Sequence, residues 1–305
     1  MAEIGSDKKN LKEILVTQKV AYYQIPIYQR PYQWDKEQCE ELLNDLFENY
    51  EDDRTSNYFC GSLVLIAIDT DSITDAKTYD IVDGQQRLST FILLAKVLAT
   101  LFLERLTDES KKYLQESWSD RCEDGEKEEE KKKRLGFDLV VSSAKKDFQD
   151  ALNFFDDLDA SKGKDSTRVK NNYLKNAICL KNYLEKKEIE DINDFIKWLY
   201  HKVIFIKTIC PNISMALRIF SVLNARGLPL HAIDVFKVEL LKKLAKEKDQ
   251  QEFVSRWNGL YQKCLDNESK ILKDLEKKKK EKRKKKKEKR KNKIEMPQKH
   301  CSVGI

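Results

Sequence analysis

The sequence predicts an α+β fold, in which a small mixed domain is followed by a mainly α-helical lobe. Two runs, 63–68 and 77–82, are β-branched or alternating in pattern and are separated by a polar stretch, as in a β-hairpin. The second run leads directly into a helical pattern whose apolar positions continue to Phe102. Later apolar segments repeat mostly at helical spacing, and 203–209 is the one strong later strand candidate.

The segment before the hairpin predicts a short helix, an extended stretch and an ordered loop, IPIYQRPYQWD, over residues 25–35. Asp35 is suited to cap a helix from Lys36 to about Tyr50. The apolar positions of that helix recur at helical spacing and predict its buried face: Leu42, Leu43, Leu46 and Phe47.

Four parts follow from these patterns. We predict a mixed domain over 11–106 and a charged linker or exposed extension over 107–136, where EDGEKEEEKKKR is too charged to build a core. A helical lobe over 137–265 is followed by a lysine-rich tail over 266–305, which we expect to be disordered.

Charge is distributed unevenly along the chain. The net charge is +6, but residues 277–293 alone hold 14 basic and 2 acidic residues, or +12, which leaves −6 for the rest. The basic run could bind phosphate backbones without sequence preference, or it could be a solvated tail or an import-like signal. The folded part is therefore mildly acidic, and only the tail is basic.

Seven cysteines are scattered without a C-x-x-C pair, and the first residues do not have the pattern of a signal peptide. No apolar run approaches the length of a membrane span. We therefore expect a cytoplasmic protein with free thiols and no membrane partner.

The most informative motif is Asp83-Gly84-Gln85-Gln86-Arg87, where a predicted strand meets a predicted helix. A helix N-terminus favours an anion, Gly84 allows close backbone approach, and Arg87 offers a planar fork of donors to phosphate. Gln85 and Gln86 could contact a base, a sugar or water. Asp83 and Gln86 also fit a capping box, so a purely structural role stays open on spacing alone.

Two other polar clusters accompany this motif. In the first loop, Gln29 and Arg30 lie among aromatic residues that could stack a nucleobase or simply anchor the loop on the core: Tyr28, Tyr32 and Trp34. The second cluster surrounds NARGLPL, where a helix is expected to end near Gly227. Its polar members are Asn224, Arg226, Asp234 and Lys237, the last two as an exposed helix pair.

Four blocks together resemble one family. IPIYQRPYQWD, YFCGSL, YDIVDGQQRLSTFILL and FSVLNARGLPLHAIDVFK stand in the order found in the N-terminal domain of GmrSD-type, modification-dependent restriction endonucleases. The resemblance covers roughly residues 11–244, and its DGQQR block is highly specific. It implies a ParB/sulfiredoxin-like domain followed by a helical lobe, with nucleoside triphosphate binding and hydrolysis coupled to DNA restriction.

The resemblance also implies functional residues. Those implied in catalysis are Asp83, Gln85 and Arg87; those implied in nucleotide binding are Gln29, Arg30, Gly84, Gln86, Asn224 and Arg226. In one departure, His231 stands where the family usually has a small hydroxyl residue, which we expect to alter a helix cap rather than the chemistry.

A chemical hypothesis follows from these assignments. Asp83 would orient water or a metal ion, while Arg30 and Arg87 neutralise charge that develops on phosphate. Mg²⁺ is the expected companion of the triphosphate because it prefers oxygen ligands. The sequence has no G-x-x-x-x-G-K-[ST] loop, so the Walker arrangement is excluded.

An HNH-type nuclease half, which full-length relatives have, is not expected in this sequence. The three histidines, His201, His231 and His300, do not share a metal-binding spacing, and no protein metal site is predicted. DNA is the expected partner, directly or through a nuclease subunit in trans. The alternatives are a non-enzymatic DNA-binding module and an inactive truncated fragment.

Overall fold

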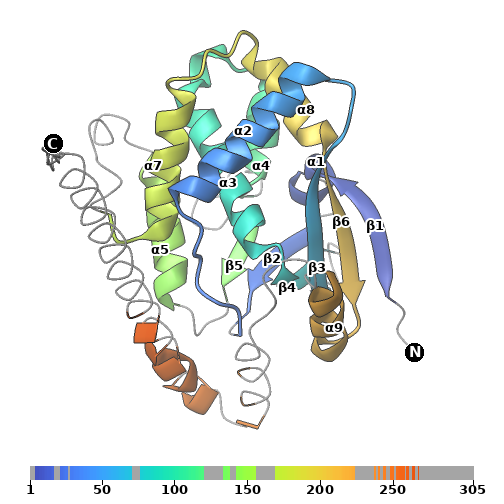
Figure 1. The fold of residues 1–305 in the computed structure, drawn as a ribbon, viewed down its shortest axis with the longest axis vertical. Coiled ribbons are helices and arrows are strands. Elements are labelled where there is room, and N and C mark those ends of the chain that lie inside the picture. The colour runs from blue at the N-terminus through green and yellow to red at the C-terminus, as the bar shows by residue number, and fades with distance from the viewer. Residues whose placement is uncertain are drawn as a thin grey trace, which may run out of the picture. The chain divides into compact units, whose positions relative to one another are not determined.

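The computed structural model describes residues 4–16, 21–26, 28–70, 76–119, 133–137, 142–155 and 169–223, with shorter stretches between 237 and 267. The chain divides into two compact units, Met1–Ala245 and Lys246–Ile305. All labelled strands and helices of Figure 1 belong to the first unit. In the second, the described residues include helical turns at 248–250 and 252–257, whereas the lysine-rich run at 277–293 lies outside the described residues.

The predicted α+β class is confirmed by one mixed six-stranded sheet with helices around it (Figure 1). The strand order is β1-β6-β3-β4-β2-β5. The strands are β1 (Gly5–Asn10), β2 (Ala21–Ile25), β3 (Tyr58–Thr70), β4 (Lys77–Asp83), β5 (Leu135–Phe137) and β6 (Val203–Cys210). The predicted hairpin is the antiparallel pair β3–β4.

The late strand β6 lies inside the sheet. It pairs in parallel with β3 and antiparallel with β1, so the part of the chain expected to be a helical lobe also contributes a strand. The strand prediction for residues 203–209 is confirmed. Val203 and Phe205 enter the large core and Cys210 enters a smaller cluster, and a short apolar run of this kind is typical of a buried strand.

Helices cover both faces of the sheet. They are α1 (Leu11–Leu15), α2 (Lys36–Asp52), α3 (Gln85–Leu101), α4 (Asp108–Glu116), α5 (Ser142–Asn153), α7 (Asn172–Leu184), α8 (Ile192–Lys202) and α9 (Ile213–Leu223), with a short 3-10 turn, η1 (Leu103–Arg105). Along β3, Leu63 and Leu65 enter the large core, whereas Val64 enters a small cluster with Ala216 of α9. Successive residues of a strand face opposite sides, so α9 covers the face opposite the large core.

The helices α2, α3 and α7 lie side by side over the large core (Figure 1). Asp35 caps α2 as predicted and forms a capping box with Gln38. The predicted apolar face of α2 is buried, and Phe47 stacks on Phe195 of α8 with ring centroids 4.5 Å apart. The starts of α2, α3 and α7 all contact the loop at residues 28–35.

The charged stretch 107–136 takes part in the core at both ends, against the expectation of an exposed connection. Tyr113 and Leu114 of α4 are buried, and Arg134 is buried with its guanidinium donating to the carbonyl oxygens of Glu116 and Ala21. The apolar residues of α4 share one helical face, which an average over composition conceals. Residues 120–132, which hold most of the charge, lie outside the described residues.

Candidate functional site at the β4–α3 junction

The motif Asp83–Arg87 lies at a sharp turn between β4 and α3. Gly84 is the N-cap of α3 and has a left-handed conformation with φ +98°. A Cβ atom at this position would come within 2.8 Å of Leu63 Cδ1 and 3.2 Å of the carbonyl oxygen of Ser62. Glycine is therefore required here both by the backbone angle and by the closeness of β3.

The capping-box interpretation of Asp83 and Gln86 is wrong. The N-cap of α3 is Gly84, and no side chain caps the helix. Asp83 Oδ2 instead accepts from Ser62 Oγ at 3.0 Å and from Arg87 Nη2 at 3.2 Å. The left-handed turn at Gly84 brings Asp83 to β3, and the first amides of α3 have no side-chain cap, an arrangement that favours an anion.

The guanidinium of Arg87 packs against β3 next to Gly61. Its Nη1 donates to the carbonyl oxygen of Cys60 at 2.8 Å, while Nη2 binds Asp83. A Cβ atom on Gly61 would lie 1.8 Å from Nη1, and Gly61 has φ +112° beside a bulge in β3. Gly61 therefore makes room for the guanidinium.

Gly61, Cys60 and Ser62 were missed as site residues by the sequence reasoning. The YFCGSL block contributes to the family resemblance, but its sequence alone indicates no role for these residues. A glycine inside a predicted strand was the available signal, because such a glycine often marks a bulge or a close approach by another group.

The first loop is tied to the end of β4. Gln29 Nε2 donates to the carbonyl oxygens of Ile81 at 2.9 Å and Val82 at 2.6 Å, so this amide braces the loop. Arg30, the next residue, is exposed to solvent. The structure thus places Gln29 and Arg30 beside the strand that ends in Asp83.

Lys237 is buried, which corrects the expected exposed pair with Asp234. Its side chain has only 2% exposure, and Nζ lies 3.5 Å from the carbonyl oxygen of Gln29. A long lysine side chain can reach an interior position that helical spacing alone does not reveal. Lys237 therefore joins the first loop, while Asp234, Asn224 and Arg226 lie outside the described residues.

The aromatic residues of the first loop serve mainly as anchors in this structure. Tyr32 is buried and stacks on Tyr173 of α7, with ring centroids 4.3 Å apart. Its hydroxyl lies 2.7 Å from Thr90 Oγ1, and burial raises its pKa well above the ordinary value. Trp34 packs against the large core. Of the two interpretations, anchoring is confirmed for Tyr32.

Gln85 and Gln86 point away from the Asp83–Arg87 pair. Gln86 Oε1 accepts from the backbone amides of Gln33 at 2.8 Å and Trp34 at 3.1 Å. Gln85 is buried with 4% exposure, and its Oε1 has no hydrogen-bond partner. Burial raises the pKa of Tyr173, whose hydroxyl interacts with Gln85 and Ser89.

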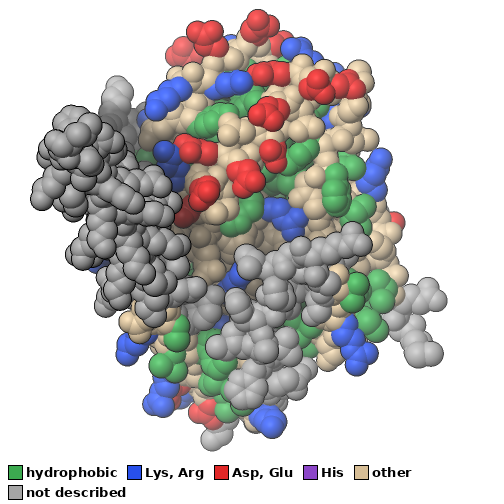
Figure 2. Space-filling model, viewed as in Figure 1, with side chains coloured by type: hydrophobic (Ala, Val, Ile, Leu, Met, Phe, Trp, Pro, Cys, Tyr) green, Lys and Arg blue, Asp and Glu red, His purple; other side chains and the backbone are tan. Residues whose placement is uncertain are grey.

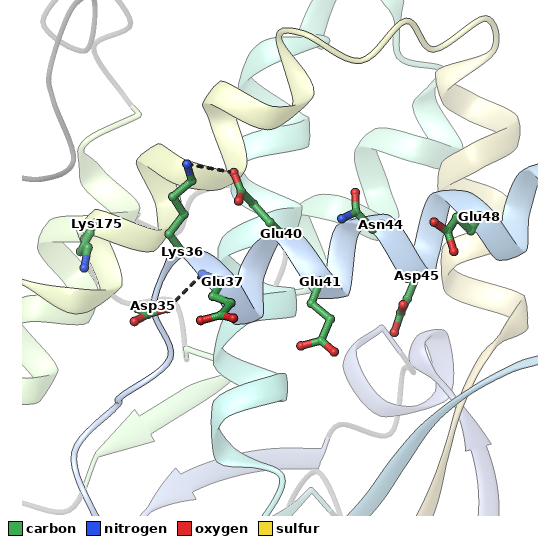
Figure 3. A pocket seen from close by; sticks show the side chains of 9 residues that line it. All are labelled: Asp35, Lys36, Glu37, Glu40, Glu41, Asn44, Asp45, Glu48 and Lys175. Atoms are coloured by element: carbon green, nitrogen blue, oxygen red, sulfur yellow. Dashed lines mark hydrogen bonds and ion pairs between the residues drawn. The ribbon is translucent and has the colours of Figure 1, made fainter. Parts of the chain in front are cut away.

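A separate hollow in the described part of the chain lies along α2 and is acidic. Figure 2 shows acidic side chains gathered over α2, and Figure 3 shows them from close by. The lining residues are Asp35, Lys36, Glu37, Glu40, Glu41, Asn44, Asp45, Glu48 and Lys175. Negative charge of this density repels phosphate.

Comparison with protein families matches residues 11–241 to the family described as the GmrSD restriction endonuclease, N-terminal domain. The chain belongs to this family. The match spans strands β2 to β6 of the sheet and the helices that surround the Asp83–Arg87 pair, and it associates the chain with restriction systems and defence. No curated protein shows significant similarity to the chain.

Neither a cluster of metal-binding side chains nor a membrane-spanning helix occurs among the described residues. No group of three or more metal-binding side chains (His, Cys, Asp or Glu) occurs among them. No helix in the described part of this GmrSD-family chain has the length and apolarity to cross a membrane.

Proposed function

We propose that residues 11–241 bind and hydrolyse a nucleoside triphosphate, and that this reaction regulates DNA restriction. The observation that carries the proposal is the Asp83–Arg87 pair beside the uncapped start of α3. The amides of a helix N-terminus without a side-chain cap, a guanidinium and a carboxylate together suit the binding and attack of a phosphate group. Family membership supports the link to restriction.

Most of the candidate residues have a proposed role. Arg87, the amides of α3 and the exposed Arg30 bind phosphate oxygens, and Lys237 adds positive charge near the first loop. Asp83 orients the attacking water, either directly or through a bound metal ion. Asn224 and Arg226 remain proposed binding residues, whereas Gln29 and Gln86 act through the first loop that they brace.

The donor set fits a Mg²⁺ ion that arrives with the nucleotide. Asp83 Oδ2 accepts two hydrogen bonds, and the carboxylate keeps 17% exposure on its side chain. Mg²⁺ bound through nucleotide phosphates needs only one or two protein carboxylates. When bound, it would neutralise phosphate charge. Asp83 is the described residue that would hold it.

The test is binding and turnover of ATP, GTP, CTP and UTP with Mg²⁺. We expect Asp83→Asn to lower turnover by about 10²-fold or more, because a positioned group at the reacting centre is lost. Arg87→Ala should abolish the rise in melting temperature that a ligand gives by mass action. The control is Arg54→Ala, which removes an exposed arginine paired with Asp194.

Wild-type protein that neither binds nor turns over any of the four nucleotides would refute the proposal. On this proposal, DNA is cleaved by a nuclease that lies outside residues 11–241, for example on a partner chain.

A DNA-binding module is the second candidate, and the charge of +12 at residues 277–293 favours it. On this alternative, an electrophoretic shift of DNA survives Asp83→Ala and disappears when residues 277–293 are removed. A shift that requires Asp83 and survives the removal would point instead to the junction.

A further inference from the structure

We propose that α7 positions the nucleotide-binding loop, through Asn172, Tyr173 and Asn176 at its start. This inference rests on the proposed function and extends it to the helical part of the chain. The three residues share one face of α7 at spacings of one, three and four positions, which a helix brings together. None of them was identified from the sequence.

The peptide groups of Trp34 are bracketed by two helices. On one side, Gln86 Oε1 of α3 accepts from the Trp34 amide at 3.1 Å. On the other, Asn176 Nδ2 of α7 donates to the Trp34 carbonyl oxygen at 2.6 Å. The carbonyl can only accept, which fixes the orientation of the Asn176 amide. The loop is therefore clamped between α3 and α7 rather than attached to one of them.

Tyr32 is held in the same way, two residues earlier. Asn172 Nδ2 donates to the Tyr32 carbonyl oxygen at 3.1 Å, and Asn176 Nδ2 donates to its hydroxyl at 3.0 Å. The Tyr32 ring stacks on Tyr173 with an interplanar angle of 13°. Main chain, ring and hydroxyl of Tyr32 all contact α7, while Thr90 of α3 contacts the hydroxyl from the other side.

This clamp determines where Arg30 can be. Gln29 is anchored on β4, and Tyr32 is anchored between α3 and α7, so only Arg30 and Pro31 lie between two fixed points. The proline ring restricts the backbone at Pro31 further. A shift of α7 therefore moves Arg30 relative to the Asp83–Arg87 pair.

The experiment compares Asn176→Ala and Asn172→Ala with the control Asn44→Ala. Asn44 of α2 accepts from Tyr183 of α7 at 2.6 Å, so the control removes an amide contact to the same helix without touching the loop. Hydrogen exchange reports the loop amides at residues 28–35, and titration with the four Mg²⁺–nucleotides reports affinity.

We expect Asn176→Ala to speed exchange at residues 28–35 and to weaken nucleotide binding at least fivefold. Asn172 is exposed, so Asn172→Ala should change loop exchange and affinity in the same direction but by a smaller factor. This variant keeps the test valid if Asn176→Ala does not fold. Asn44→Ala should change neither. Unchanged loop exchange in folded variants overturns the inference, as does faster exchange with unchanged affinity. A wild type that binds no nucleotide refutes the proposed function, while loop exchange still decides whether α7 holds the loop.

Discussion

Gly61→Ala should destabilise the protein by displacing Arg87. A left-handed backbone costs an alanine about 1–2 kcal/mol relative to glycine, and the residue has φ +112°. The added methyl group would also lie 1.8 Å from Arg87 Nη1, so the guanidinium must leave its contacts with Cys60 and Asp83. Those charge-assisted bonds are partly exposed, and their loss adds about 1–2 kcal/mol. The expected total is about 2–4 kcal/mol.

A double-mutant cycle separates the two contributions. Urea unfolding would be measured for wild type, Gly61→Ala, Arg87→Ala and the double variant. In the Arg87→Ala background, Gly61→Ala has no guanidinium to displace and should cost only the backbone contribution of about 1–2 kcal/mol. If Gly61→Ala lowers the free energy of unfolding equally in both backgrounds, the idea that Gly61 makes room for Arg87 is refuted.

Three further predictions concern the core, the loop and pH. Leu94→Ala, at a fully buried position of α3, should cost about 2–5 kcal/mol in urea unfolding; a loss below about 1 kcal/mol would contradict the packing described. Tyr32→Phe should cost about 1–2 kcal/mol, because its buried hydroxyl bonds to Thr90 and Asn176 are lost, and an unchanged unfolding midpoint would count against them. Burial, and then Lys12, lower the pKa of His201 below its ordinary 6.5, so the unfolded chain binds more protons and stability should fall as pH drops through about 6.5. Parallel pH profiles for wild type and His201→Gln would exclude this contribution.

Elements with a strong local pattern could be predicted from the sequence. β4 and α3 follow each other in patterns of period two and 3.6, and α2 begins at the expected Asp35 cap. β1 was not predicted, because GSDKKN is polar and mostly exposed. It is a strand through its ladder of hydrogen bonds with β6, a partner about 200 residues away. Local propensity contains no information about such a partner.

The candidate site shows the same limit. The DGQQR motif marked the right junction, but spacing suggested that Asp83 and Gln86 bind each other's helix end. The hydrogen bonds that Asp83 and Gln86 form instead depend on the left-handed conformation of Gly84 and on the partners available on β3 and in the first loop. Gly61 and Asn176 gain their roles only from contacts with residues far away in the sequence. The sequence therefore predicts which residues belong to the site better than it predicts where their side chains point.

The position of β6 has a consequence for how the chain becomes folded. Because β6 lies between β1 and β3, those two strands have no partner on that side until residues 203–210 are available. Some 130 residues separate the end of β3 from the start of β6, so a ribosome releases β3 well before its neighbour emerges. An unpaired β3 edge with Phe59 and Ile68 exposed is a template for aggregation during that interval. Fragments that end before residue 203 should therefore need a chaperone to stay in solution.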